Sequence, residues 1–184
     1  MAQISIAGDT SGSITLAAPA VAGTNTLTLP TLTATVAVNG PAFSVYLSGN
    51  QSISSSTATK IAFNTEEFDT ASCFNNTGST VGGIPAYAFL PNVAGYYQFS
   101  GVCVNGGSSI SNNWFRLYRN GSAYSNGTGG GVTTGYLSFA DIVYLNGTTD
   151  YVEFYGFITA TSPTFNGGSA PTLTKVAGCL LRAA

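Results

Sequence analysis

The sequence predicts an all-β protein, in which an extended N-terminal β arm precedes a sandwich or jelly-roll head. Three observations predict this fold class. Apolar residues alternate with Ser, Thr and other polar residues over short segments, which is the two-residue period of a half-buried strand. Asn-Gly pairs and other turn signals separate these segments, and no stretch has the helical period of about 3.6 residues. Many short strands joined by tight turns are typical of a sandwich or a jelly roll.

A change in composition divides the chain near Asn39-Gly40-Pro41. Every Phe, Tyr and Trp lies after Pro41, and Asp9 is the single charged residue of residues 1–40. The Asn-Gly and Gly-Pro pairs at the boundary are turn signals in their own right. We therefore expect two parts, an arm over residues 1–40 and a head over residues 41–184.

The arm is predicted to consist of thin strands at residues 3–6, 13–16, 26–29 and 33–38. These segments alternate small apolar residues with Ser or Thr, and Gly and Pro interrupt them. Strands with so little apolar mass are poorly equipped to form a core alone, so the arm is expected to need a partner surface. Six apolar residues are its candidate attachment residues: Ile4, Ile6, Ile14, Leu16, Leu27 and Leu29.

The head is predicted to contain larger strands of the same period. Tight turns are expected at Asn120-Gly121, Asn146-Gly147 and Asn166-Gly167-Gly168, because such pairs favour hairpin turns. The main strands are expected at residues 42–47, 95–104, 114–119, 135–145 and 150–160.

Charge and hydropathy exclude several classes of function. Only 7% of the residues are charged, and five Lys and Arg residues with a net charge of −2 cannot form a nucleic-acid-binding stripe. The apolar runs are far shorter than the about 20 residues that cross a bilayer, and the N-terminus lacks the pattern of a secretory signal. We expect no nucleic-acid partner and no membrane span.

The candidate catalytic and metal-binding residues are few. The chain has no histidine, so the commonest general base is missing and no Ser-His-Asp arrangement can form. Glu66, Glu67 and Asp69 form an acidic cluster, but adjacent Glu66 and Glu67 on a strand point to opposite sides. The cluster is either a calcium site, of which it would supply only part of the oxygen shell, or a solvated loop. We expect no enzyme, no catalytic residue and no cofactor.

The three cysteines, Cys73, Cys103 and Cys179, lack the paired spacing of a zinc site. Cys103 and Cys179 each stand in an apolar strand pattern, where cysteine is usually a small buried hydrophobe. One disulfide with a free third thiol is the alternative. Neither reading gives these residues a catalytic role.

Six strings of the second part stand in a characteristic order: PAFSVYLSGNQSI, TKIAFNTEEFD, FLPNVAGYYQFS, FRLYRNGS, VYLNGTTDYVEFYGF and KVAGCLL. In this order they resemble the jelly-roll family of complement globular heads and tumour-necrosis-factor ligands, over about residues 41–184. Gly- and Asn-rich stretches at 75–86 and 125–134 depart from the family and are expected to be loops.

The resemblance implies a jelly roll of the ten-stranded type and a homotrimer, in which three heads pack around a threefold axis with inner-sheet aromatics buried between them. Arg116 and Arg119, three residues apart on one strand, are expected to face opposite sides of the sheet. One of them is expected to form an ion pair with Asp141 or Glu153 at the interface between two copies of the trimer. The alternative is a role at the exposed surface. The candidate trimer-interface or core residues are Tyr96, Phe99, Phe115, Tyr151, Phe154 and Leu180.

The opening string GDTSGSITLAAPAVAGTNTLTLP resembles the start of phage tail-fibre, neck-appendage and head-decoration proteins. This implies a virion protein, assembled in the host cytoplasm, that binds a major capsid protein or tail subunits through its arm. A capsid decoration (cement) protein is favoured, because the head follows the arm at once and an extended arm reaches roughly 130 Å. The alternative is a short tail-fibre adhesin that recognises a host surface glycan or protein.

Overall fold

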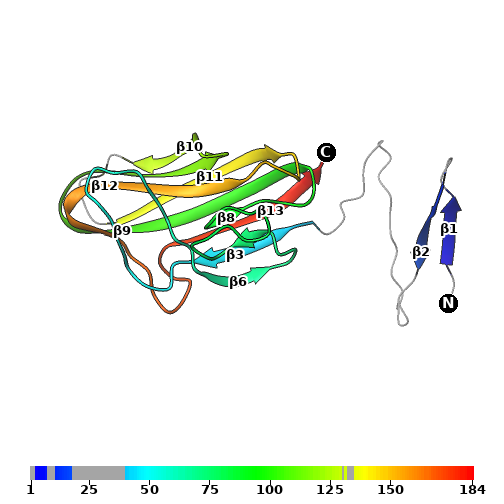
Figure 1. Cartoon of the computed structure of the whole chain (residues 1–184), viewed down its shortest axis with the longest axis horizontal. Coiled ribbons are helices and arrows are strands. Elements are labelled where there is room, and N and C mark those ends of the chain that lie inside the picture. The colour runs from blue at the N-terminus through cyan, green and yellow to red at the C-terminus, as the bar shows by residue number, and fades with distance from the viewer. Residues whose placement is uncertain (1–2, 8–10, 18–39, 130, 132–134) are drawn as a thin grey trace. The chain divides into compact units, whose positions relative to one another are not determined.

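The computed structural model describes residues 3–7, 11–17, 40–129, 131 and 135–184. The strands expected at 26–29 and 33–38, with Leu27 and Leu29, lie outside the described residues. Contacts divide the chain into two units, Met1–Val36 and Ala37–Ala184, and each is described by itself. The described residues form strands and no helix, which confirms the all-β prediction (Figure 1). Accordingly, this part of the chain contains no helix that could span a membrane.

The first unit contains an antiparallel pair of strands, β1 (Gln3–Ala7) and β2 (Ser13–Ala17). In its register Ile4 pairs with Leu16 and Ile6 with Ile14. Ile6 is exposed, and among the described residues each strand has only the other as a neighbour. A hairpin of two strands is marginally stable by itself, and its outer edges carry unpaired backbone groups.

The head contains eleven strands in its described part. They are β3 (Ala42–Tyr46), β4 (Gln51–Ser52), β5 (Thr59–Lys60), β6 (Thr65–Asp69), β7 (Phe74–Asn75), β8 (Ala88–Phe89), β9 (Gly95–Arg119), β10 (Ser122–Gly129), β11 (Gly135–Leu145), β12 (Val152–Phe165) and β13 (Lys175–Ala183).

The strands form a sandwich of two layers that share β9 (Figure 1). The first part of β9 pairs with β11 on one side and with β13 on the other, and β13 continues to β3 and β6. The later part of β9 pairs with β10 and β12, and β12 continues to β4, β5 and β8. The sandwich agrees with the predicted jelly-roll class.

The prediction of two separate strands at 95–104 and 114–119 was wrong, because β9 runs unbroken through both. The stretch between them is rich in Gly, Ser and Asn, so the alternating pattern disappears there. Its backbone nevertheless keeps pairing with β12, with two register shifts. Positive φ angles at Gly107 (126°) and Ser109 (55°) lie in this stretch. The irregular backbone takes the chain from one layer to the other without a turn.

The prediction of a loop at 125–134 was also wrong for residues 125–129, which belong to β10. Gly127 explains this, because a Cβ atom there would lie 2.6 Å from the carbonyl oxygens of both Phe115 and Ser138. Glycine is thus what lets β10 pass this close to its neighbours. The stretch after β7, by contrast, is irregular up to β8 apart from one isolated bridge between Val81 and Ile84.

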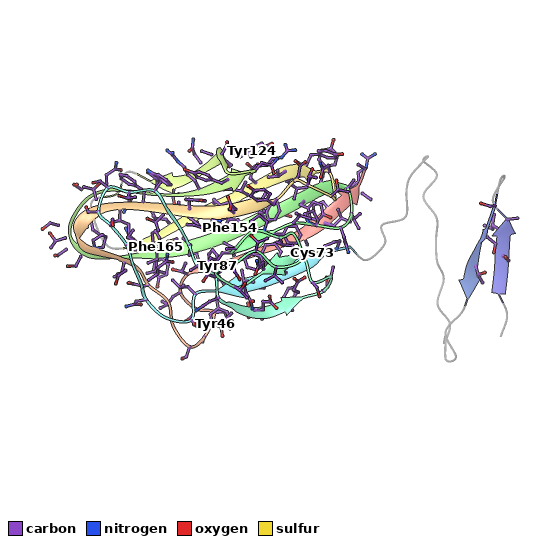
Figure 2. All side chains as sticks on the ribbon, in the orientation of Figure 1. Tyr46, Cys73, Tyr87, Tyr124, Phe154 and Phe165 are labelled. Carbon is purple, nitrogen blue, oxygen red and sulfur yellow. The ribbon has the colours of Figure 1, made fainter. Side chains whose placement is uncertain are left out.

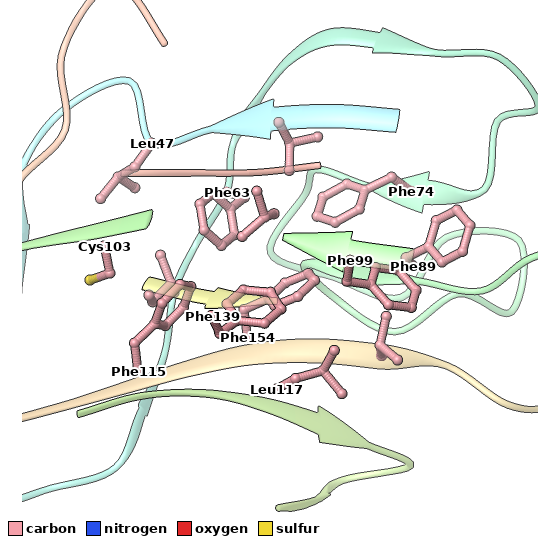
Figure 3. Packing of buried hydrophobic residues seen from close by; sticks show 14 of the residues in the cluster. Leu47, Phe63, Phe74, Phe89, Phe99, Cys103, Phe115, Leu117, Phe139 and Phe154 are labelled. Atoms are coloured by element: carbon pink, nitrogen blue, oxygen red, sulfur yellow. The ribbon is translucent and has the colours of Figure 1, made fainter. Parts of the chain in front are cut away.

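Aromatic residues from both layers fill the core (Figure 3). Phe43 stacks on Phe89 with 4.6 Å between ring centroids, and Phe99 contacts Phe154 edge-on at 6.3 Å. Such pairs stabilise a core beyond the area that they bury. The largest side chains with no exposed surface are Tyr97, Phe43, Phe63, Phe89, Phe99, Phe115, Phe154 and Phe165.

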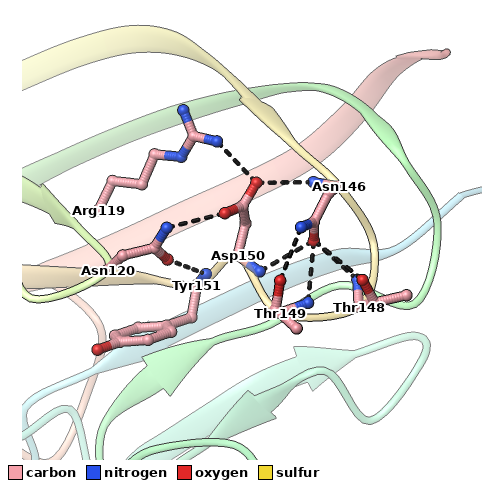
Figure 4. Close-up of polar contacts among 7 residues, drawn as sticks. All are labelled: Arg119, Asn120, Asn146, Thr148, Thr149, Asp150 and Tyr151. Carbon is pink, nitrogen blue, oxygen red and sulfur yellow. Dashed lines mark hydrogen bonds and ion pairs between the residues drawn. The ribbon is translucent and has the colours of Figure 1, made fainter.

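A buried carboxylate joins two turns at one end of the sandwich (Figure 4). Asp150 Oδ2 accepts hydrogen bonds from Arg119 Nη2 at 2.7 Å and from the Asn146 backbone N–H at 3.0 Å, and Oδ1 accepts one from Asn120 Nδ2 at 2.8 Å. Burial acts to raise the pKa of Asp150, but these hydrogen bonds outweigh it and lower the pKa. Asn120 and Asn146 open the two predicted Asn-Gly turns, so the network holds both turns in place.

Candidate functional site

One outer surface of the head consists of uncharged side chains, and we call it the uncharged face. Alternate residues of β9, β11 and β13 point into the core, so the residues between them point outward. Its members are Tyr96, Gln98 and Ser100 of β9, Tyr136, Ser138, Ala140, Ile142 and Tyr144 of β11, and Ala177 and Cys179 of β13.

The strand register places large side chains at the two ends of this face and small ones in the middle. At one end Tyr96 pairs with Tyr144, with 5.5 Å between ring centroids. At the centre Ser100 pairs with Ala140. At the other end Tyr136 is 69% exposed. The exposed tyrosines of this face are thus separated by small side chains.

Two charged side chains of β13 border the face. Lys175 Nζ donates to Glu67 Oε2 at 2.8 Å, and Ser44 Oγ donates to the same oxygen at 2.6 Å. These hydrogen bonds lower the pKa of Glu67, which keeps it ionised beside the lysine. Arg182 pairs with Tyr96 in the register at the end of the layer and is exposed. The centre of the face is therefore neutral.

The outer surface of the other layer is different, because its rings stack on one another. Trp114 stacks on Phe157 at 5.2 Å between centroids and Tyr118 on Tyr155 at 4.0 Å, and all four are half-buried. The Arg116 guanidinium lies 4.2 Å from the centre of the Trp114 ring. The rings of this surface cover one another, whereas Tyr136 and Ile142 of the uncharged face are more than half exposed.

The arginine and the carboxylate that were expected to pair across the trimer interface have other partners within the chain. Arg119 pairs with Asp150 rather than with Asp141 or Glu153, and Glu153 pairs with Lys60. Tyr124, which projects from β10 at the surface of the head (Figure 2), has its ring 5.9 Å from the Arg119 guanidinium.

The six candidate interface or core residues separate into different environments. Phe99, Phe115 and Phe154 have no exposed surface and belong to the core. Leu180 packs against the core and Tyr151 is half-buried beside the Asp150 network, whereas Tyr96 is 46% exposed on the uncharged face.

Sequence reasoning missed the β11 contribution to this face. Ile142 is 55% exposed and Tyr144 is 38% exposed, although both stand in a strand that was correctly placed. The signal was the two-residue period itself, because Phe139 and Val143 are buried and the residues between them must face outward.

The acidic cluster is divided among separate contacts. Asp69 accepts hydrogen bonds from the backbone N–H groups of Ala71 and Phe74, at 3.1 and 2.7 Å, and Glu67 bonds to Lys175 and Ser44. Burial, with a smaller effect of Asp69, raises the pKa of Glu66. In the described part of the chain no three His, Cys, Asp or Glu residues are grouped so as to hold a metal ion.

The three cysteines are free thiols. Cys73 and Cys103 are buried, and burial raises the pKa of Cys103 to about 12. The expectation that Cys179 is buried was wrong. It pairs with Gln98 in the register and belongs to the outward-facing set, while its neighbour Gly178 faces the core.

Comparison with known proteins supports the fold. No protein-family model matches the chain, and no curated protein matches it in sequence. Among solved structures, the globular domain of zebrafish complement 1qA protein is 16% identical, with a TM-score of 0.53 over 78% of this chain and 99% of that one. Murine APRIL is 11% identical, with a TM-score of 0.54 over 77% of this chain and 98% of that one. PRD1 vertex protein P5 is 13% identical, with a TM-score of 0.52 over 79% of this chain and 100% of that one.

These similarities agree with the jelly-roll fold that the sequence resemblance implies.

Proposed function

We propose that this protein is a non-enzymatic structural protein of a bacteriophage particle, a homotrimeric capsid decoration (cement) protein attached through its N-terminal arm. The uncharged face carries this proposal. A monomer exposes Tyr136 and Ile142 to water at 69% and 55%, and burial of apolar area contributes roughly 25 cal/mol per Å². Association of three heads through this face removes that exposure.

The position of the face supports the proposed trimer. The jelly-roll family that the sequence resembles implies packing of inner-sheet aromatics around a threefold axis. The layer of β11, β9 and β13 leaves Tyr136 and Ile142 more than half exposed, whereas Trp114 and Tyr118 of the other layer stack on neighbouring rings. The head thus has one surface suited to its own copies and another suited to solvent.

The arm supports attachment to a particle. Its two described strands lack further neighbours among the described residues, so their outer backbone groups are free to add to a sheet edge of another protein. A major capsid protein or a tail subunit is the expected partner. The similarity of the head to PRD1 vertex protein P5, a phage protein, supports a location in the virion, after assembly in the host cytoplasm.

A non-enzymatic role is supported by the chemistry of the side chains. The chain has no histidine, and Glu67 and Asp69 are committed to structural hydrogen bonds.

A second candidate, a tail-fibre adhesin for a host glycan or protein, is favoured by the loop of residues 76–87. Asn75 is 4% exposed and its Nδ2 donates to the carbonyls of Ser79, Ile84 and Pro85, which holds the loop in one conformation. Val81 in this loop is 52% exposed. Loops held on rigid scaffolds often carry binding residues.

The trimer is tested by light scattering on the full chain with labelling of its native thiols. We expect a trimer at micromolar concentration, in which Cys179 reacts slowly with a maleimide. Dilution below the dissociation constant of the trimer should expose Cys179 and speed its labelling. Cys73 and Cys103, which are buried in the head, should stay protected. A monomer throughout, with rapid Cys179 labelling, contradicts the trimer.

The role on the particle is tested by deleting the protein from the phage. Particles that lack a cement protein should lose resistance to heat and osmotic shock and still adsorb to cells. Sturdy particles that fail to adsorb indicate the adhesin instead. Deleting residues 1–38 should abolish incorporation while the head stays folded, and normal incorporation contradicts attachment through the arm.

A further inference from the structure

An open groove with a volume of about 730 Å³ crosses the middle of the uncharged face. Ser100, Ala140 and Ala177 contribute small side chains to it from three adjacent strands. Residues 126–128 of β10 line it as well, and so does Lys175, whose charge is paired with Glu67. The groove is therefore neutral and wide enough for a large side chain.

Tyr136 stands beside this groove without filling it. It precedes Ser138, a groove residue, by one outward-facing position on β11, which corresponds to about 7 Å along the strand. Its exposed fraction of 69% is the highest of the large apolar residues in the described part of the chain. An exposed tyrosine thus lies next to an open groove of small residues on the same face.

A closed threefold ring requires this kind of pairing. Its contacts are heterologous, so one patch of each copy meets a different patch of the next copy. Tyr136 and the groove are two such patches, because Tyr136 lies one outward-facing position from Ser138 at the groove. Tyr96 and Tyr144 instead contact each other, with 5.5 Å between ring centroids.

We propose that Tyr136 of each copy inserts into the groove of the next copy and is the central contact of the trimer. The inference rests on the proposed trimer and names the side chains that make it. The ring covers small residues on the groove floor, and its hydroxyl meets polar groups of Asn126 and Thr128 on β10. Tyrosine is among the residues that dominate interface energies when such a pocket surrounds it.

The first test measures association of the full chain by sedimentation. Tyr136→Ser empties the groove and Ala140→Trp fills it, and both positions are exposed, so the fold should be kept. Each substitution should raise the dissociation constant of the trimer by at least about tenfold. Tyr124→Ser, at a tyrosine that is 50% exposed on β10 and outside the uncharged face, is the matched control and should leave association unchanged.

The second test locates the contact directly. Two differently tagged chains, one with Tyr136→Cys and one with Ala140→Cys, both also carry Cys179→Ser and are mixed with a short bismaleimide, because a gap the length of a tyrosine side chain exceeds the reach of a disulfide. We expect a crosslink that joins the two tags, and no crosslink in either chain alone.

The outcomes separate this inference from the trimer itself. A wild-type trimer with full association of Tyr136→Ser and no crosslink between the tags overturns the contact and leaves the trimer standing. Association that is weakened by Tyr136→Ser but not by Ala140→Trp also overturns the proposed contact, because the groove is then not the site that Tyr136 occupies. A wild-type monomer overturns both proposals.

Discussion

Arg119, the last residue of β9, donates a hydrogen bond from Nη2 to Oδ2 of Asp150, just before β12, at 2.7 Å. The side chain of Asp150 is only 10% exposed and that of Arg119 is 27% exposed, so the pair is largely removed from water. Hydrogen bonds to charged groups in such a setting contribute more than those at a free surface. The pair closes the end of the sandwich where two turns meet.

Asp150→Asn should destabilise the head, because the new amide places a donor among the donors of Arg119 and Asn120. The expected loss is about 1–3 kcal/mol, read from the urea midpoint of unfolding. Asp141→Asn is the control, since its Oδ1 accepts a hydrogen bond from the Ile142 N–H that an amide oxygen also accepts. That variant should change stability by less than about 0.5 kcal/mol. Equal midpoints for the two variants contradict the role of Asp150.

Stability should fall in acid through the same carboxylate. The pKa of Asp150 is lower in the folded protein than in the unfolded chain. Its contribution is therefore complete above the unfolded value, about 4, and is lost as the pH falls through the folded value. Urea midpoints measured from neutral pH downward should drop below about pH 4. Asp150→Asn should flatten this drop, and the lowered pKa of Glu67 should leave a residual slope. An unchanged slope in the variant excludes Asp150 as its source.

Gly156→Ala should destabilise the head through overpacking. A Cβ atom at this position lies 2.4 Å from the ring of Phe165, which has no exposed surface and cannot move aside freely. Overpacking of this kind costs about 1–3 kcal/mol. Gly135→Ala is the matched control, because a Cβ atom there meets nothing within 4 Å. Thermal unfolding of the two variants checks the difference, and a stable Gly156→Ala variant shows that the core has room at this point.

Substitution by alanine should strongly destabilise the head at Phe99 and have little effect at the adjacent Gln98. Phe99→Ala removes a ring that contacts Phe43, Phe89 and Phe154, so it should lower stability by about 3–5 kcal/mol. Gln98→Ala, on the uncharged face, should keep the head folded. Circular dichroism and urea unfolding at low concentration measure both. A Gln98→Ala variant as unstable as Phe99→Ala contradicts the assignment of the two faces.

The strand content of the head was predictable from the sequence, because alternation is a local property of the chain. The segment GYLSFADIVYL was expected at residues 135–145 and forms β11 with those bounds. The Asn-Gly turns at 120–121 and 146–147 were predicted as well, and the Asp150 network holds both of them. The continuity of β9 was not predictable from the sequence. Its polar middle is held in a strand by pairing with β12, which lies far along the chain.

The sequence by itself determined that this protein is made of strands and that it lacks the residues of a histidine-based active site. Only the tertiary structure decided which of two neighbouring apolar residues is buried where both sides of a strand carry them. Tyr96 and Tyr97 are adjacent and chemically alike, yet Tyr97 has no exposed surface and Tyr96 is 46% exposed. Tyrosine stands on both sides of β9 at this point, so residue type alone does not choose between Tyr96 and Tyr97. The choice depends on the opposing layer, whose rings, Phe89 among them, cover one side of β9 and leave the other open.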